Sequence, residues 1–426
     1  MVREEFMQAI LVFNFILSIV FTVCYLYQFF YVFVGLFKKP IRFKAKKNHR
    51  YAVVICARNE RRVIGNLIES VKNQTYPAEL VDVFVVADNC TDTTPEVARE
   101  AGAIVYERHN MEKVGKGYAL DWFFKQLDRD YANKGYEAFI VFDADNVLDP
   151  HFIEEMNGTF DAGYRIITSY RNSKNYDHNW ITAGYSLWFL REAKFLNNSR
   201  MQLGNSCAIS GTGFLVSKEI IDANGGWIHH LLTEDIVFTP DSIIKGEKIG
   251  YSGDANLYDE QPTTFRQSYF QRLRWAKGFY QVFAKYSGRL LKGVFKGNFS
   301  CYDMLMTLMP AMLLTLVSIV LALCAIPVCA SMQLDSFPMV KTLLETVLSF
   351  YLRFFLLGAL TTITERKQIH CGKIKRVLYL FTFPLFMLTY IPISLVALFT
   401  KVEWKPIKHS VSITVDDIVS DAEPVQ

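Results

Sequence analysis

The chain lacks the cysteine and glycine patterns that identify several large classes of protein. Its eight cysteines form no C-x-x-C pair and no zinc-binding spacing. No G-x-x-x-x-G-K-[S/T] loop occurs, and the G-K-G at 115–117 lacks the third glycine of a dinucleotide-binding fingerprint. These absences argue against a disulfide scaffold, a zinc protein, a P-loop NTPase and a Rossmann dehydrogenase, and they suit a reducing compartment.

The chain also lacks a strong excess of charge. Its 46 lysines and arginines against 42 aspartates and glutamates leave a formal net charge of +4, which gives no support for binding to nucleic acid. The basic residues gather at 38–50, 266–296 and 366–376, each beside an apolar run. Clusters in such positions orient a protein in a bilayer and attract anionic headgroups, so we expect membrane lipids as partners.

Long apolar runs account for much of the 51% hydrophobic content. Three nearly uncharged runs are near or above the roughly 20 residues that cross a bilayer: 6–37, 304–330 and 378–400. The first is too long for a signal-peptide core and has no small-residue cleavage site, so we interpret it as a retained anchor. Residues 340–363 carry Lys341, Glu345 and Arg353, so this segment is a weaker span or lines a polar path between helices.

Basic residues after the first run set the expected topology. By the positive-inside rule, the cluster at 38–50 places the following domain in the cytosol. We therefore expect a multi-pass protein of the plasma (inner) membrane whose catalytic domain is cytosolic. The number of spans after the domain stays open. Three further spans would put the tail outside, whereas Lys401, Lys405 and Lys408 predict a cytosolic tail.

Residues 48–260 are predicted to form an α/β domain. Short apolar, β-branched runs predict buried strands at 52–57, 81–87, 103–107 and 138–142. Helical spacing predicts helices at 60–73, 95–101 and 117–127. This alternation predicts a mainly parallel sheet covered on both faces. The rest of the chain divides into an N-terminal transmembrane anchor (1–37), amphipathic interfacial helices (261–300), a C-terminal transmembrane region (301–400) and a polar tail (401–426).

Polar motifs follow three of the predicted strands. They are Asn59-Glu60, Asp88-Asn89 and Asp143-Ala-Asp145. Because ligands bind at the carboxyl ends of strands in open α/β sheets, we expect these side chains to converge on one rim. The Asp-x-Asp pair can hold a divalent cation against a diphosphate, and Asp88 with Asn89 can bind a base edge or a ribose. For both motifs the alternative is ordinary turn chemistry.

Two further stretches suit phosphate and acceptor binding. Lys116, between two glycines, offers a cation on a flexible backbone. Residues 210–213 predict a tight turn, either near the acceptor or with a packing role. Thr233-Glu234-Asp235 precedes an apolar helical run. Either Thr233 caps that helix, with the acids complementing its dipole, or Asp235 is a general base for an acceptor hydroxyl.

The most specific pattern is Gln271-Arg272-Leu-Arg274-Trp275. Two arginines can grip a diphosphate, and an indole offers a flat apolar face to a sugar ring. The alternative is a basic, amphipathic interfacial helix, which does describe residues 266–296. That alternative does not explain why glutamine, two arginines and tryptophan occur at this spacing.

In this order, the motifs resemble those of membrane-integrated family 2 glycosyltransferases, the group that includes cellulose, hyaluronan and poly-N-acetylglucosamine synthases. The resemblance covers about residues 50–285. It implies a GT-A fold, that is, an α/β nucleotide-diphospho-sugar transferase domain, here with N- and C-terminal transmembrane helices. It also implies inverting, single-displacement transfer from a UDP-sugar donor to a glycan or lipid-linked acceptor, with Mg²⁺ or Mn²⁺ as cofactor.

The resemblance also assigns roles to particular residues. Asp235 would be the base, with Glu234 beside it in the catalytic centre, and Trp275 would border the acceptor. Asp145, together with Asp143, would hold the metal. The nucleotide-sugar would be bound by Asn59, Glu60, Asp88, Lys116, Asp143, Gln271, Arg272 and Arg274.

Three functions stay open at this point. A processive synthase of a β-linked polysaccharide is the first expectation, because the last motif stands beside membrane segments. The small number of those segments favours instead a single addition to a lipid or lipid-linked acceptor. A catalytically inactive subunit is disfavoured, because every residue that the chemistry needs is present. The sequence names neither the sugar nor the acceptor, and it leaves room for an accessory subunit.

Overall fold

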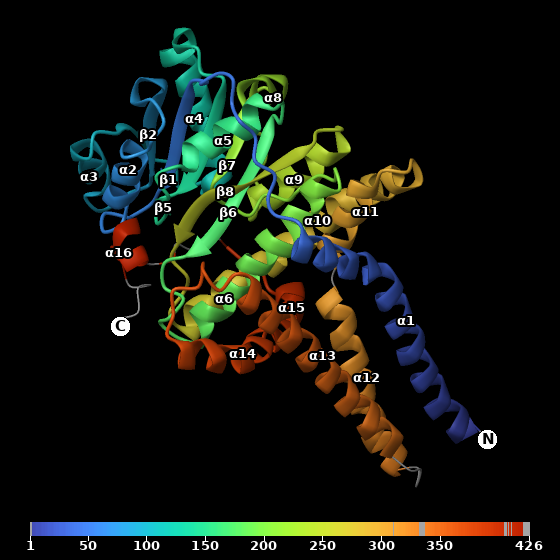
Figure 1. Cartoon of the computed structure of the whole chain (residues 1–426). Coiled ribbons are helices and arrows are strands. Elements are labelled where there is room, and N and C mark those ends of the chain that lie inside the picture. Colours follow the sequence, from blue (N-terminus) through green and yellow to red (C-terminus); the bar gives the residue numbers. More distant parts are fainter. Residues whose placement is uncertain are drawn as a thin grey trace.

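The computed structural model describes residues 2–309, 311–331, 337–403, 407, 409 and 411–420. Figure 1 shows a sheet with helices on its faces and a group of long helices that extend away from it. The strands are β1 (Tyr51–Ala57), β2 (Val81–Asp88), β3 (Ile104–Arg108), β4 (Ala138–Asp143), β5 (Val147–Leu148), β6 (Ile166–Ser173), β7 (Phe214–Ser217) and β8 (Ile249–Asp259).

Helices make up most of the remaining structure. The α-helices are α1 (Val2–Phe37), α2 (Ile64–Lys72), α3 (Thr94–Glu100), α4 (Lys116–Tyr131), α5 (Phe152–Asp161), α6 (Trp180–Arg191), α7 (Asn198–Gln202), α8 (Lys218–Ala223), α9 (Glu234–Ile244), α10 (Phe265–Phe295), α11 (Phe299–Leu308), α12 (Ala311–Ser331), α13 (Phe337–Thr364), α14 (Lys373–Leu388), α15 (Tyr390–Phe399) and α16 (Val415–Ser420). Two short 3₁₀ helices are η1 (Ala78–Leu80) and η2 (Ala132–Lys134), and η3 (Glu192–Asn197) is a π-helix between α6 and α7.

The eight strands form one mixed sheet in the order β3-β2-β1-β4-β7-β6-β8-β5. β1 pairs in parallel with β2 and β4, and β2 pairs in parallel with β3. In the second half, β7 runs antiparallel to β4 and β6, and β5 runs antiparallel to β8. β6 pairs in parallel with β8. The expectation of a mainly parallel sheet is therefore confirmed for β1 to β4 and for the β6–β8 pair, whereas β7 and β5 run antiparallel to their neighbours.

Side chains of the central strands are buried on both faces of the sheet. Ala52 and Val54 of β1 join a hydrophobic cluster with residues of α4, whereas Val53 and Ile55 join a second cluster with residues of α2 and α5. All four are fully buried. Burial on both faces explains why the sequence of β1 is continuously apolar instead of alternating between apolar and polar residues.

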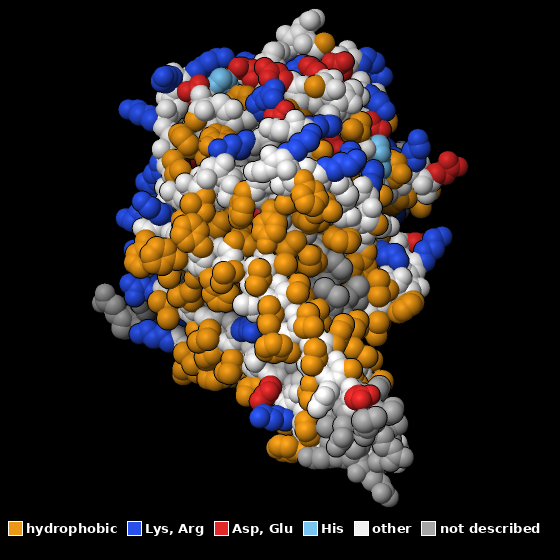
Figure 2. Space-filling model, turned by 90° about the vertical axis from the view of Figure 1, so that its right-hand side faces the viewer, with side chains coloured by type: hydrophobic (Ala, Val, Ile, Leu, Met, Phe, Trp, Pro, Cys, Tyr) orange, Lys and Arg blue, Asp and Glu red, His pale blue; other side chains and the backbone are white. Residues whose placement is uncertain are grey.

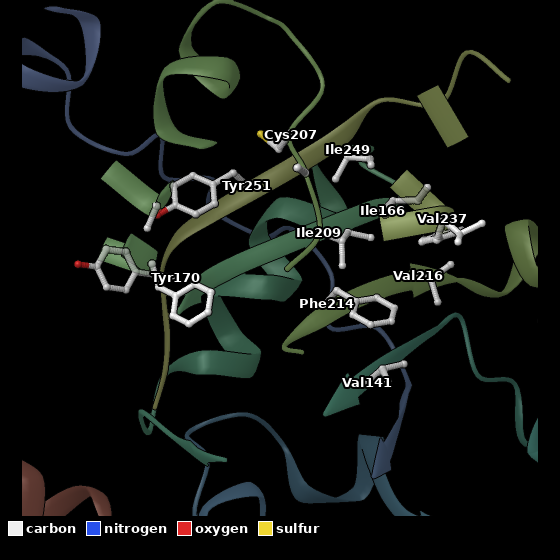
Figure 3. Close-up of a cluster of buried hydrophobic side chains, with 14 of the residues drawn as sticks. Val141, Ile166, Tyr170, Cys207, Ile209, Phe214, Val216, Val237, Ile249 and Tyr251 are labelled. Atoms are coloured by element: carbon white, nitrogen blue, oxygen red, sulfur yellow. The ribbon is translucent and has the colours of Figure 1, made fainter. Parts of the chain in front are cut away.

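The first of these clusters continues into the second half of the sheet. Figure 3 shows Val216 of β7 and Ile249 of β8 in this cluster, together with Val237 of α9. This packing holds the helix that begins with Glu234 against the sheet. The four predicted strands each lie within one residue of the observed bounds, but α2 begins at Ile64 rather than at residue 60, because the chain first turns at Glu60.

Within the described residues, three helical segments are long and apolar enough to cross a membrane, by length and composition: Gln8–Phe37, Phe337–Thr364 and Lys373–Phe399. The second is the segment that the sequence ranks as a weaker span. The predicted span at 304–330 is wrong in extent. Met309, before a proline in the sequence, has non-helical backbone angles (φ −58°, ψ 133°), so that α11 and α12 are separate helices.

The surface of these helices is strongly apolar. In Figure 1, α1, α12 and α13 extend away from the sheet, and Figure 2 shows hydrophobic side chains covering that part of the molecule while charged ones gather around the sheet. Phe15, Val23 and Phe29 of α1 are 64–68% exposed. Apolar patches of this extent mark a surface that something apolar covers, and a bilayer fits helices of this length.

The last apolar segment behaves differently. The predicted span at 378–400 lies in α14 and α15, which meet at Thr389. Of its most apolar stretch, 44% is buried inside the protein, against 6% for the stretches in α1 and α13. α14 packs on α6 and α13, and α15 packs on α10 and α12. This helix pair therefore lies against the protein instead of standing free.

A buried polar network fastens α1 to the rest of the molecule. Arg200 of α7 forms an ion pair with Asp303 of α11, with 2.7 Å between Nε and Oδ2, and both side chains are almost fully buried. Tyr27 and Tyr31 of α1 donate hydrogen bonds to the same carboxylate at 3.0 and 2.9 Å. The Ser199 hydroxyl donates to the Tyr31 carbonyl at 2.6 Å. One carboxylate thus joins three helices.

Replacing Asp303 by alanine is expected to lower the free energy of unfolding by about 3–5 kcal/mol, because it leaves the Arg200 charge buried without its partner. Denaturant unfolding of the detergent-purified protein measures the loss. Asp254→Ala, which breaks the exposed ion pair with Arg42, is the matched control and should change little. Equal stability of the two variants would contradict this role of Asp303.

Candidate active site

A cavity of about 1440 Å³ begins at the carboxyl ends of β1, β2 and β4 and continues between α1 and α13. Ten of the twelve side chains predicted for the site line it: Glu60, Asp88, Lys116, Asp143, Asp145, Glu234, Asp235, Gln271, Arg274 and Trp275. Asn59 and Arg272 do not line it. The motifs are spread over more than 200 residues of sequence, and the sheet brings them to one rim.

Lys116 links the glycine-flanked turn to the Asp-x-Asp motif. Its Nζ donates to Asp143 Oδ1 at 2.6 Å and to the Gly211 carbonyl at 2.9 Å. Burial alone would lower the pKa of Lys116, but Asp143 and Glu234 raise it above its ordinary value, so the side chain stays charged. A side chain at Gly117 would meet the His229 carbonyl at 2.2 Å, so only glycine allows this close approach.

Asp145 is a second carboxylate on the same rim. It is 6% exposed, and its Oδ2 accepts from the backbone N–H of Glu260 at 3.0 Å. Burial raises the pKa of Asp145, but His409 and Lys174 outweigh that effect and hold it below its ordinary value. Asp145 is therefore an ionised, inward-facing carboxylate, as a cation ligand needs to be.

Asp88 and Asn59 are both bonded to neighbouring side chains or backbone groups of the protein. Asp88 lines the cavity but is ion-paired with Arg108, and burial raises its pKa despite that arginine. Asn59 adopts a left-handed backbone conformation (φ 61°), which is uncommon for a residue other than glycine. Its amide is bonded to Thr91, with the Thr91 N–H donating to Oδ1 at 2.8 Å. Asn59 thus ties together the turns after β1 and β2 rather than facing the cavity.

Thr233-Glu234-Asp235 stands at the start of α9 without the predicted cap. The Thr233 side chain makes no capping hydrogen bond; it packs where a Cβ on Gly278 of α10 would lie 2.3 Å from its Oγ1. Burial raises the pKa of Glu234 to about 7, with a further rise from Asp235 and an opposing effect of Lys116. Burial also raises the pKa of Asp235. Two carboxylates with raised pKa values in one cavity are typical of acid–base sites.

The two arginines of the last motif point in different directions. Arg272 is fully buried, and its Nη1 donates to Thr389 Oγ1 at 2.6 Å and to the Phe386 carbonyl at 3.2 Å. Its guanidinium also lies 4.6 Å from the centre of the Phe386 ring. In this arrangement Arg272 does not line the cavity, because its Nη1 is bonded at the junction of α14 and α15, and its predicted contact with the diphosphate stays a prediction.

The other members of that motif face the cavity. Gln271, Arg274 and Trp275 line it, and Gln271 Oε1 is buried without a hydrogen-bond partner in the part of the chain that the structure describes. The Trp275 ring meets Tyr185 and Phe189 edge-on, at 5.7 and 6.3 Å between centroids. One face of α10 thus lines the cavity, and the face that carries Arg272 contacts α14 and α15.

The C-terminal tail adds residues that sequence reasoning missed. His409 Nδ1 lies 2.9 Å from Glu60 Oε1, and its Nε2 lies 3.9 Å from Asp145 Oδ2. The Val411 N–H donates to Glu260 Oε2 at 2.9 Å. The tail therefore lies on the same side as the sheet. A single histidine in a polar tail carries no local signal, and only the fold brings it to the rim.

The residues present fit a divalent cation that is bound together with a donor. Asp145 supplies an ionised carboxylate, and Asp143 and His409 lie on the same rim. Among the described residues, no three histidine, cysteine or acidic side chains are arranged to hold a metal alone. A Mg²⁺ or Mn²⁺ ion here would therefore also need oxygen atoms of a diphosphate, which both ions accept.

Comparison with known proteins identifies the family to which the chain belongs. Residues 49–278, more than half of the chain, match the model described as "Glycosyltransferase like family 2", so the chain belongs to the family 2 glycosyltransferases. It is similar to a beta-monoglucosyldiacylglycerol synthase of Synechocystis, with 28% identity over 247 residues, which cover 55% of this chain and 48% of that protein. It is also similar to a poly-beta-1,6-N-acetyl-D-glucosamine synthase of Staphylococcus aureus, with 24% identity over 53% of each chain. The chain spans about half the length of the curated relatives it matches.

A solved structure extends the likeness to the long apolar helices. A mannosyltransferase of Pyrobaculum calidifontis, determined with GDP-mannose and Mn²⁺, matches with a TM-score of 0.53 at 16% identity, covering 92% of this chain and 98% of that one. At this identity the match concerns the fold, and it confirms the predicted GT-A architecture with flanking apolar helices.

The raised carboxylate pKa values predict a pH dependence. A general base acts when ionised, and burial raises the pKa of Asp235, so the initial rate of nucleotide release should begin to fall at a higher pH than an ordinary aspartate would give. Glu234→Gln removes a neighbouring negative charge and should move the inflexion to lower pH. A rate that stays constant down to a pH of about 5 would contradict coupled, raised pKa values at this site.

Replacing Arg272 and Arg274 separately by methionine distinguishes their roles. Arg272→Met is expected to lower the melting temperature while the folded protein still binds UDP, because its contacts are with α14 and α15. Arg274→Met should keep the melting temperature and weaken UDP binding about tenfold, since charge-assisted contacts are strong. Calorimetric titration and thermal unfolding measure both variants. The reverse pattern would restore Arg272 to the donor site.

Proposed function

We propose that the protein transfers a sugar from a UDP-sugar to a hydroxyl group of a lipid or lipid-linked acceptor that enters from the bilayer. One observation carries this proposal: the cavity that contains Asp235 is also lined by residues of α1 and α13. Both helices are long and apolar enough to cross a membrane. An acceptor with an apolar body can therefore reach the carboxylates without leaving the bilayer.

The proposed topology has α1, α12 and α13 crossing the bilayer and α14 with α15 lying at its surface. Contact between His409 and Glu60 supports this arrangement, because the tail must return to the side of the sheet. α12 and α13 together supply the even number of crossings that this requires. We expect that side to be the cytosol and the bilayer to be the plasma membrane, which agrees with the basic cluster at 38–50.

In the proposed reaction, the acceptor hydroxyl attacks the anomeric carbon from the side opposite to the leaving UDP. Asp235 accepts the hydroxyl proton, the new glycosidic bond forms as the bond to the diphosphate breaks, and the configuration inverts. Lys116 and Arg274 stabilise the charge that develops on the diphosphate. A bound Mg²⁺ or Mn²⁺ would supply further charge neutralisation there, with Asp145 as its ligand from this chain.

A second candidate is processive synthesis of a β-linked polysaccharide. The residues that line the membrane part of the cavity support it, because they include Ser18, Thr22 and Gln28 of α1 and Thr346 and Ser349 of α13. Polar faces on two membrane helices suit a hydroxyl-rich chain as well as a lipid headgroup. The relatives include a beta-monoglucosyldiacylglycerol synthase and a poly-beta-1,6-N-acetyl-D-glucosamine synthase, which accord with the first and the second candidate respectively.

The test is nucleotide release by detergent-purified protein with a panel of UDP-sugars and GDP-mannose, with Mg²⁺ or Mn²⁺, in the presence and absence of neutral glycerolipids. We expect release with one donor, strong stimulation by lipid and a product that carries a single added sugar or a few. Asp235→Asn should reduce the rate at least 100-fold.

High-molecular-weight product formed without added lipid would instead establish the second candidate. No release with any donor, from protein that still binds UDP, would count against both.

A further inference from the structure

A carboxylate that the proposed chemistry does not use lies in the same cavity. Glu192 is the first residue of the π-helix η3, directly after Arg191 at the end of α6. Both side chains line the cavity, together with Trp188 and Phe189 of α6. π-helical turns inside α-helices are rare, and they occur often at functional sites because they displace side chains from the regular helical face.

Contacts connect this position to the catalytic rim. An added Cβ on Gly211 would lie 3.6 Å from Asp235 Oδ2 and 3.7 Å from Arg171 Nη1. Arg171 in turn donates to the Ser210 carbonyl at 2.7 Å and lies 3.8 Å above the centre of the Phe189 ring. The turn at residues 210–211 therefore stands between the base and the end of α6.

The neighbouring residue Arg191 connects the end of α6 to the apolar helix α1. Arg191 Nη2 donates to Gln28 Oε1 of α1 at 3.0 Å, and its guanidinium lies 4.8 Å from the centre of a Trp188 ring. Its Nε is buried and has no hydrogen-bond partner among the described residues. Glu192 and Arg191 thus occupy the passage from the membrane part of the cavity to Asp235.

The electrostatics of this passage favour a neutral ligand. Burial raises the pKa of Glu192, with Arg200, Arg191, Arg171 and Ser210 partly offsetting the rise. Arg191 compensates the charge of Glu192, and Arg171 is ion-paired with Asp259, so the passage has no excess of positive charge that would favour a phosphate. A hydroxyl group can donate to the Glu192 carboxylate and accept from an arginine N–H at the same time.

We propose that Glu192 and Arg191 form the acceptor subsite, which binds hydroxyl groups of a neutral, polyol- or sugar-bearing lipid headgroup beside Asp235. This inference rests on the proposed function and names the class of its acceptor. Glu192 is a positioning residue: it holds the headgroup so that one hydroxyl faces the base, while the acyl chains extend between α1 and α13. The Trp188 ring offers an apolar face to the same headgroup.

Steady-state kinetics on Glu192→Gln test the proposal, with diacylglycerol and a monoglycosyl-diacylglycerol in mixed micelles as acceptors. The variant keeps the shape but loses the charge, so the acceptor KM is expected to rise about tenfold or more. The donor KM and the slow donor hydrolysis without acceptor should stay at wild-type values. Glu219→Gln, which alters an exposed carboxylate 75% accessible to solvent, is the matched control. An unchanged acceptor KM would overturn the proposal.

Wild-type protein gives a second test that does not depend on any variant folding. Neutral hydroxylated lipids should be glycosylated, whereas a polyprenyl phosphate or phosphatidic acid in the same micelles should not. Preferred transfer to the anionic lipids would overturn the inference about the passage. Absence of transfer to every acceptor and to water would instead contradict the proposed function itself, so the two failures are distinguishable.

Discussion

The shape of the cavity depends on one buried ion pair. Arg200 and Asp303 hold the π-helical region and α11 together, and the tyrosines of α1 share the same carboxylate. Without this network α1 has few fixed contacts with the sheet, because most of its surface is exposed and apolar. The position of the apolar helix α1 beside the rim is thus set by directional polar groups as well as by packing against η3 and α7.

Much of the rim could be predicted from the sequence because it follows a local rule. β1, β2 and β4 are short apolar runs, and in a parallel sheet their carboxyl ends meet at one edge. Asp88, Asp143 and Asp145 could therefore be expected together without any knowledge of long-range packing. The same logic does not extend to the second half of the sheet, where β7 runs antiparallel to β4 and β6 while β6 and β8 are parallel. This mixed pairing is set by tertiary contacts and leaves no simple period in the sequence.

The missed features all depend on contacts between distant segments. Arg272 and Arg274 are two residues apart in one helix and so face different directions, and only the position of α14 and α15 decides which one meets the cavity. His409 reaches Glu60 across 349 positions of sequence. Glu192 belongs to a π-helix, which no residue pattern marks. Strand ends are predictable from short motifs, whereas the roles of single polar residues on helices and tails are not.

The central claim is that the acceptor reaches the catalytic carboxylates between α1 and α13. Photo-crosslinking tests it directly, with p-benzoylphenylalanine in place of Ser349, which lines the cavity, or of Leu348, which is 57% exposed on another face of α13. Irradiation during turnover with a radiolabelled UDP-sugar should attach labelled glycolipid at position 349 and not at 348. Equal labelling at both positions, or labelling at 348 alone, would contradict a path through this cavity.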